Sequence, residues 1–263
     1  MKQLSFSCVC SLLVFSTLTF GQTKKVVSAN QAQNFQYEVE QFADIKVLRY
    51  QVPAWNKLTL KEKQLVYYLT QAGTCGRDIM WDQNYRHNLK IRKALENIYT
   101  KYQGNKNAPE WKNFVVYLKR VWFSNGIHHH YSSDKIRPDF PKAYFVQLLA
   151  ATKTTLSPEI VDILFNDVDN KKVNLDQERG LLSGSAVNFY QPGITVSEVE
   201  EYYKSQPQDT KRPVSLGLNS KLIKNEDGKL EEKVWKVGGM YSPAIKRIIY
   251  WLQQAIEVAE NEK

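Results

Sequence analysis

The sequence predicts a mainly α-helical fold with one small β-hairpin, and three observations support this. Two capping boxes, Thr59-Leu-Lys-Glu62 and Thr195-Val-Ser-Glu198, each place a hydroxyl where it can accept from a helical amide while the Glu reaches back. Apolar residues recur at helical spacing after most of the helix start signals. One Asp-Gly pair, at 227–228, separates two runs that favour extended structure.

The elements follow in chain order. Helices are expected at about 60–73, 77–102, 109–123, 142–152, 158–166 and 195–204, and from Ser242 toward the C-terminus. The hairpin is expected over 214–224 and 229–237. Residues 124–141 read as a long loop, because Ser124-Asn125-Gly126 ends a helix and Pro138 and Pro141 bracket the exit. The last helix carries a continuous apolar face from Ile245 to Ala259, so exposed apolar surface is expected there.

The first residues predict an exported protein, periplasmic or extracellular. Met1-Lys2 is a basic start, residues 4–20 are apolar or small, and a polar stretch opens at Gly21-Gln22, as in a secretory signal. We expect residues 1–21 to be the signal, 22–41 a flexible leader and 42–263 the folded body, with no membrane span in the mature form. An uncleaved anchor and a lipidated anchor are the alternatives, although Cys8 and Cys10 lie too early in the apolar stretch for lipid attachment.

Composition limits the function classes. The chain has 263 residues, 43% of them hydrophobic, and a formal net charge of +9. Its Lys and Arg residues are interleaved with acids, as in Lys61-Glu62-Lys63, which favours solvated helix faces over a nucleic-acid surface. After signal removal only Cys75 remains, so no internal disulfide is expected. A catalytic thiol at Cys75 is a minor alternative.

The most conspicuous local pattern is His128-His129-His130. Zinc needs ligands that converge from different chain directions, whereas three consecutive side chains diverge. Only His87 remains as a further histidine, so hydrogen bonding or the lining of a cleft is the favoured interpretation, with a metal site as the alternative. Phosphate loops, dinucleotide fingerprints and esterase elbows are not found. The residues alone therefore give no complete catalytic set.

Several stretches resemble the dipeptidyl peptidase III family, especially its exported Bacteroides-type members. They run in order through residues 42–263: Phe42–Tyr50, Leu65–Leu69, Gly76–Ile79, Asp82–Asn84, Tyr117–Tyr131, Gly217–Leu222 and Glu232–Gly239. The resemblance implies a two-lobed, α-rich peptidase that removes dipeptides from the N-terminus of short peptides, with zinc held by an H-E-x-x-G-H helix in the upper lobe.

This chain matches only the N-terminal part of the lower lobe and lacks that motif. The resemblance therefore implies an incomplete lobe, inactive alone, with no catalytic residue, no metal ligand and no bound zinc of its own. Zinc belongs to the full-length enzyme, and the partners implied are short peptides and the remaining C-terminal lobe. The alternative is a non-enzymatic peptide-binding or interaction protein derived from half of such a peptidase.

Two substrate-binding residues follow from the same resemblance. Ser124-Asn125 and Lys135–Pro138 match the family's cleft loop, and Tyr131 falls where other members place an aromatic residue that lines the substrate site. Asn125 and Tyr131 are thus the predicted substrate-binding residues. Packing of Tyr131 against helix 109–123 is the alternative. The role of His128, His129 and His130 stays open, because they replace a Gly-Asn-Tyr type stretch of the eukaryotic branch.

Overall fold

The computed structural model describes residues 35–259 apart from 208, 210 and 214, and over this range it is mainly helical with two small antiparallel hairpins. The expected signal, and most of the expected leader, lie outside the described residues. The two hairpins are made by β1 (Glu38–Phe42) with β2 (Ile45–Leu48), and by β3 (Ser220–Lys224) with β4 (Leu230–Val234). The mainly α fold class with a small β-hairpin is therefore confirmed.

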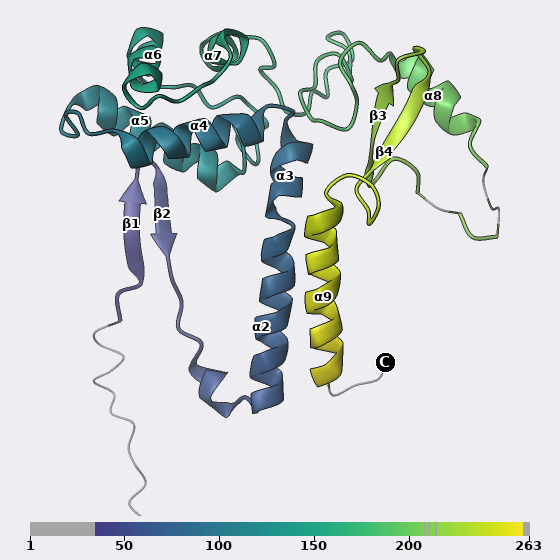
Figure 1. The fold of residues 1–263 in the computed structure, drawn as a ribbon, viewed down its shortest axis with the longest axis horizontal. Helices are drawn as coiled ribbons and strands as arrows, with labels where there is room; N and C mark the ends of the chain where they lie inside the picture. The colour runs from purple at the N-terminus through teal and green to yellow at the C-terminus, as the bar shows by residue number, and fades with distance from the viewer. Residues whose placement is uncertain (1–34, 208, 210, 214, 260–263) are drawn as a thin grey trace, which may run out of the picture.

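Four helices form the core. In Figure 1, α4 (Asn88–Lys101) and α5 (Pro109–Ser124) lie beneath α6 (Lys142–Ala151) and α7 (Pro158–Phe165). The apolar stripe of α4 is Ile91, Leu95 and Ile98, spaced by four and three residues and fully buried. It belongs to one cluster with aromatic and aliphatic side chains of α5, α6 and α7. This core gives the loops around it a rigid base.

The helix expected over 77–102 is in fact two, α3 (Arg77–Asn84) and α4. Tyr85 breaks it by adopting an extended backbone, with φ −170° and ψ 136°. In that conformation its ring is fully buried and its hydroxyl donates to Asp169, 84 residues along the chain. A contact so distant leaves no trace in the helical periodicity, so the sequence prediction of one helix was wrong here.

The β1–β2 hairpin was not expected, and it takes up the end of the predicted leader. Its turn contains Ala43 in a left-handed conformation, with φ 48°, where glycine would have been the usual signal. Lys119 and Arg120 of α5 pair with Glu40 and Asp44 of the hairpin. Side chains from α5 therefore hold in place a hairpin that is itself mostly exposed.

The predicted second hairpin is confirmed but shorter than the 214–224 and 229–237 runs. Asn225 organises its turn, because its side-chain oxygen accepts from the amides of Asp227 and Lys229 at 3.0 and 2.9 Å. The helix predicted at about 195–204 is α8 (Val196–Lys204), and its Thr195–Glu198 capping box is present as predicted. The short 3-10 helix η1 (Pro53–Lys57) precedes α2.

A pair of helices extends away from the core. Figure 1 shows α2 (Leu60–Cys75) and α9 (Ser242–Val258) side by side, and the rings of Tyr68 and Trp251 stack between them at 5.9 Å. The predicted Thr59–Glu62 capping box starts α2. Large apolar side chains stay in solvent on both helices, with Leu60 72% and Ile256 70% exposed. Within the described residues, each helix is too short or too polar to cross a bilayer.

This exposed surface predicts binding of a hydrophobic dye. Contiguous apolar patches of more than a few hundred Å² are rare on stable monomers and attract apolar ligands. Ile256→Lys should reduce the fluorescence of an added naphthalene-sulfonate dye without lowering the melting temperature, because the side chain is already in solvent. The matched control is Glu257→Gln, which changes the net charge equally but removes no apolar atoms. Equal dye signals for wild type and Ile256→Lys would contradict the prediction.

Candidate functional site

The loop after α5 folds as an irregular hairpin, called here the aromatic loop (residues 127–136). The amide of Ile136 donates to the carbonyl of Ile127 at 2.8 Å, and the amide of His129 donates to Asp134 at 2.7 Å. Ser133, with φ 63°, helps close the tip. The loop also pairs with the segment after α7, since the amide of Lys172 donates to Ser133 at 2.7 Å. The expectation of an ordered loop is confirmed, although it contains short bridges.

Asn88 fixes the start of the aromatic loop. This side chain is fully buried, accepts from the amide of Ile127 at 3.1 Å and donates to the carbonyl of Trp81 at 3.0 Å. Gly126 makes the approach possible: its φ is +149°, and a Cβ there would lie 2.2 Å from the Asn88 Nδ2 atom. Sequence reasoning missed Asn88, for which the only signal was a weak helix former inside a predicted helix.

Asn125, one of the two predicted substrate-binding residues, ends α5. It adopts the left-handed conformation, with φ 52° and ψ 41°, which asparagine tolerates better than most residues. Its main-chain oxygen accepts from the side chain of Asn84 at 3.1 Å. The side chain of Asn125 makes no hydrogen bond within the described residues. The structure thus shows a turn-forming role, and substrate binding by Asn125 stays a prediction.

His128 differs from its two neighbours because it points into the protein. It is 2% exposed, and its Nε2 lies 2.7 Å from the carbonyl oxygen of Asp169, so this nitrogen carries the proton. Its Nδ1 is buried without a hydrogen-bond partner among the described residues. Burial lowers the pKa of His128 to about 4, so the ring is neutral at pH 7. His128 is therefore a structural side chain at the base of the loop.

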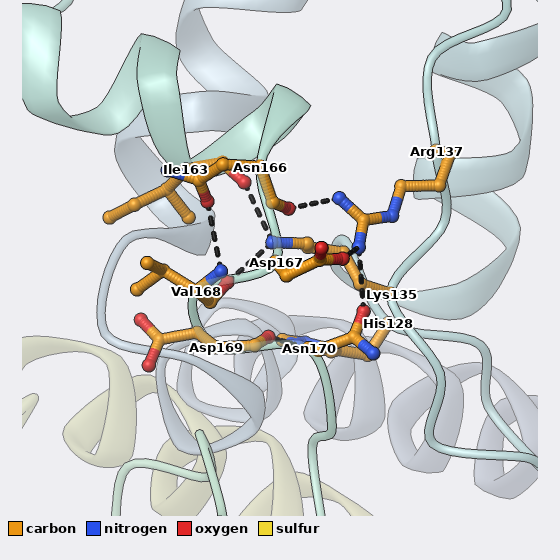
Figure 2. A network of polar contacts seen from close by, with 9 residues as sticks. All are labelled: His128, Lys135, Arg137, Ile163, Asn166, Asp167, Val168, Asp169 and Asn170. Carbon is orange, nitrogen blue, oxygen red and sulfur yellow. Dashed lines mark hydrogen bonds and ion pairs between the residues drawn. The ribbon is translucent and has the colours of Figure 1, made fainter.

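A second buried polar side chain, Lys135, holds the other strand of the loop. Figure 2 shows its ammonium group between the carbonyl oxygens of Ile163, at 2.7 Å, and Val168. These carbonyls belong to the last turn of α7 and the chain just after it, where a cation also complements the helix dipole. Burial lowers the pKa of Lys135 to about 8.

Arg137 extends the same network at the surface. Its guanidinium donates to the carbonyl of Asn166, to Asp167 and, at 2.9 Å, to the side chain of Asn170. Lys135 and Arg137 both lie in the stretch matched to a cleft loop. They turn toward the 163–170 segment, so the structure gives them an anchoring role.

The tip of the aromatic loop exposes a cluster of rings, called here the aromatic platform: Phe123, His129, His130 and Tyr131. The centroid of His130 lies 4.5 Å from both His129 and Tyr131 and 5.0 Å from Phe123 of α5. The His129 Nδ1 accepts from the amides of Tyr131 and Ser132 at 3.2 Å, which fixes that ring. Tyr131 is 87% exposed, so most of its surface is not packed against α5.

A groove borders the platform. It has a volume of about 650 Å³ and lies between the aromatic loop, α5 and the turn of the β1–β2 hairpin at Ala43. Charged side chains of both signs line it, including Arg120, Asp134 and Asp139. A ligand bound along the platform could therefore place polar groups against this groove. The groove could not be predicted from the sequence, because the hairpin that closes it was unexpected.

The histidines do not fit a zinc site. His128 is turned into the protein, the Nδ1 of His129 is engaged by two amides, and His130 stacks between aromatic rings. Over the described residues, no cluster of three or more His, Cys, Asp or Glu side chains could hold a metal ion. The arrangement offers aromatic faces and hydrogen-bonding groups instead.

Comparison with known proteins gives distant structural likenesses only. No protein-family model matches the chain, and no curated protein matches it. Among solved structures, that of DPP III from Caldithrix abyssi aligns with 79% of this chain at 20% identity and a TM-score of 0.44. The alignment covers 29% of that protein's chain, so this chain spans less than a third of its length.

The buried neutral His128 predicts a pH-dependent stability. Its pKa is depressed in the folded state, so the unfolded chain binds more protons as the pH falls below about 6.5. The free energy of unfolding should therefore be lower at pH 5 than at pH 7, with this group accounting for about 2 kcal/mol of the difference. Urea unfolding at both pH values measures the loss.

His128→Gln keeps an N–H donor for the Asp169 carbonyl and does not titrate in this range. This variant should lose about 2 kcal/mol less than wild type between the two pH values. His130→Gln, at an exposed ring of the platform, is the matched control and should behave more like wild type. The same pH dependence in wild type and His128→Gln would contradict the assignment.

Proposed function

We propose that this chain is the N-terminal portion of an exported, dipeptidyl peptidase III-like zinc exopeptidase and forms part of the surface that binds short peptides. The observation that carries the proposal is Tyr131, which is 87% exposed on a loop whose base is fixed by buried polar contacts. A large aromatic ring that lies mostly in solvent on a rigid loop is suited to bind a ligand.

The way in which the matched stretches meet supports the same proposal. Helix α3 carries Asp82–Asn84 and is linked to two other matched stretches that lie far away in the sequence, to one directly and to the other through Asn188. Asn84 donates to the carbonyl of Asn125 at 3.1 Å, and Asp82 accepts from Asn188 at 3.2 Å. Asn188 in turn accepts from Lys221 of β3 at 2.6 Å. Three of the stretches that carry the family resemblance are therefore joined by polar contacts.

The chemistry of the site suits peptides. Aromatic faces bind apolar and backbone atoms of an extended peptide, and the mixed charges along the groove can pair with its polar groups. The resemblance places the zinc helix outside the matched region, so the catalytic step is assigned to the remaining lobe of the enzyme. In this proposal the chain binds and orients peptides, and it holds no metal.

The proposal predicts that the isolated 263-residue chain releases no dipeptides. The candidate site has aromatic and hydrogen-bonding groups but no set of side chains that would hold zinc. Incubation with a dipeptidyl arylamide and added zinc should give no product above a protein-free control. Release that is abolished by a chelator would contradict the proposal and would require metal ligands in this chain.

Peptide binding by the platform is tested with Tyr131→Ala. Losing an aromatic contact typically costs about 0.5–1.5 kcal/mol beyond area burial, so affinity for a penta- or hexapeptide should fall roughly several-fold. Tyr131→Phe should retain most of the affinity. Tyr50→Ala is the matched control, because Tyr50 is 76% exposed and lies outside the platform. Titration calorimetry measures the affinities, and melting temperatures should stay unchanged.

A lower melting temperature with unchanged peptide affinity would make Tyr131 a packing residue and contradict the proposed site. If Tyr131→Ala and Tyr50→Ala weaken binding equally, the contact is nonspecific and the platform is not the site. Specific peptide binding by a chain that has no catalytic activity in any assembly would favour the alternative, a non-enzymatic peptide-binding protein.

A further inference from the structure

A second cavity lies apart from the aromatic platform and its groove. Its volume is about 470 Å³, which is within the range of about 300–1,000 Å³ common for small-molecule sites. The walls come from the loop between Gly180 and Val196, and the polar end comes from Arg86 and Asp169. The proposed peptide-binding site uses none of these side chains.

The polar end is an ion pair whose hydrogen-bonding groups are only partly occupied by protein partners. Arg86 Nη2 donates to Asp169 Oδ2 at 2.6 Å, and the Tyr85 hydroxyl donates to the same oxygen at 2.7 Å. Within the described residues, no hydrogen bond reaches Asp169 Oδ1 or the other nitrogens of Arg86. The pair thus keeps one carboxylate oxygen and several guanidinium N–H groups for a ligand.

The backbone of Asp169 adopts a conformation that directs its carboxylate. Its φ is 53°, in the left-handed region, which Asp tolerates better than most residues other than glycine. The carbonyl oxygen accepts from His128 on one side, while the carboxylate reaches Tyr85 and Arg86 on the other. In Figure 2 the carboxylate points away from Lys135 and Arg137. Left-handed residues other than glycine are concentrated at functional sites.

Apolar side chains form part of the cavity wall, and the two serine hydroxyls in it already have hydrogen-bond partners. Leu181, Val187, Pro192 and Ile194 line the cavity. The hydroxyls of Ser183 and Ser185 are already bonded to carbonyls of their own loop, at 3.3 and 2.6 Å. A ligand would therefore meet these four apolar side chains, together with the polar residues Asn188, Tyr190, Gln191 and Thr195, in addition to the ion pair.

The walls are also fixed in advance. The amides of Ala186 and Val187 donate to Lys171 and Lys172 at 2.9 and 3.0 Å, and the amide of Asn188 donates to Gln83 at 2.8 Å. On the far side, the amide of Gln191 donates to Leu222 at 2.9 Å. A wall that is ordered before binding lowers the entropy cost of holding a ligand.

We infer that this cavity binds a small zwitterion with an apolar side chain, either a free amino acid or a dipeptide. The ion pair carries one positive and one negative group, so a ligand that has both an ammonium group and a carboxylate can pair with both of them. An α-ammonium group can donate to Asp169 Oδ1, and a carboxylate can accept from the free N–H groups of Arg86. The apolar side chain then contacts Leu181 and Ile194.

Calorimetric titration of the whole chain with four compounds tests the inference. L-leucine and leucyl-leucine carry both charges, N-acetyl-leucine amide carries neither, and L-lysine carries a net positive charge. At least one of the two leucine zwitterions should bind saturably, and at least tenfold more tightly than the amide and lysine. Preference between leucine and leucyl-leucine decides between an amino acid and a dipeptide. No saturable binding of either, or equal binding of the amide, overturns the inference.

Variants locate the site. Asp169→Asn keeps the side-chain shape and tolerates the left-handed backbone, and it should weaken binding at least tenfold. Leu181→Trp fills the cavity from a position that is 42% exposed and leaves the ion pair in place, so it should weaken binding similarly without loss of melting temperature. Leu175→Trp, at an 83% exposed position outside the cavity, is the matched control. Unchanged binding in Leu181→Trp overturns the inference.

The two proposed sites can be tested independently of each other. Tyr131→Ala should leave binding of the zwitterion unchanged, while Leu181→Trp should leave the affinity of the platform for a hexapeptide unchanged. Loss of zwitterion binding in Tyr131→Ala would place that ligand on the platform and overturn the cavity assignment.

Discussion

The structure depends most on a simple constraint: the polar backbone groups of its long irregular segments have to find partners where they are buried. Two side chains supply many of these partners. The side chain of Asn88 bonds both ends of the turn at Asn125–Ile127. The ammonium group of Lys135 donates to carbonyls in the last turn of α7 and just after it. An unsatisfied buried polar group costs about 1–3 kcal/mol, so each side chain decides whether its segment has one conformation or several.

This constraint explains why the candidate site is rigid at its base and exposed at its tip. His128 and Lys135 face inward from opposite strands of the aromatic loop and bond the 163–170 segment. Between them, the backbone of the tip accepts from the amide of Lys172, while the rings of His129, His130 and Tyr131 stack mainly on one another. The aromatic rings can therefore meet a ligand without first being released from the core.

Local signals made much of the fold predictable. Both capping boxes were readable because the groups that form them lie within three residues of each other, and the Asn225–Gly228 turn was readable for the same reason. The helix boundaries at Leu60, Pro109, Pro158 and Ser242 agree with the start signals in the sequence.

Distant contacts account for the errors. Tyr85 breaks the predicted long helix for a bond to Asp169, and the β1–β2 hairpin relies on partners in α5 that lie 76 and 79 residues away. The candidate site shows the same division. Tyr131 was named through the family resemblance, and substrate binding by this residue stays a prediction. Asn88, the anchoring role of Lys135 and the groove were not predicted, since each is defined by a neighbour that only the fold brings near.

Asp169 shows how one residue can serve two features that the sequence gives no reason to connect. Its left-handed backbone sends the carbonyl toward His128 and the carboxylate toward Arg86. A right-handed or extended conformation would turn one of these groups away from its partner. The strain of about 1–3 kcal/mol that such a backbone typically stores is offset by bonds to Tyr85, Arg86 and His128. The carbonyl group of Asp169 therefore stabilises the base of the aromatic loop, while its carboxylate forms part of the polar end of the second cavity.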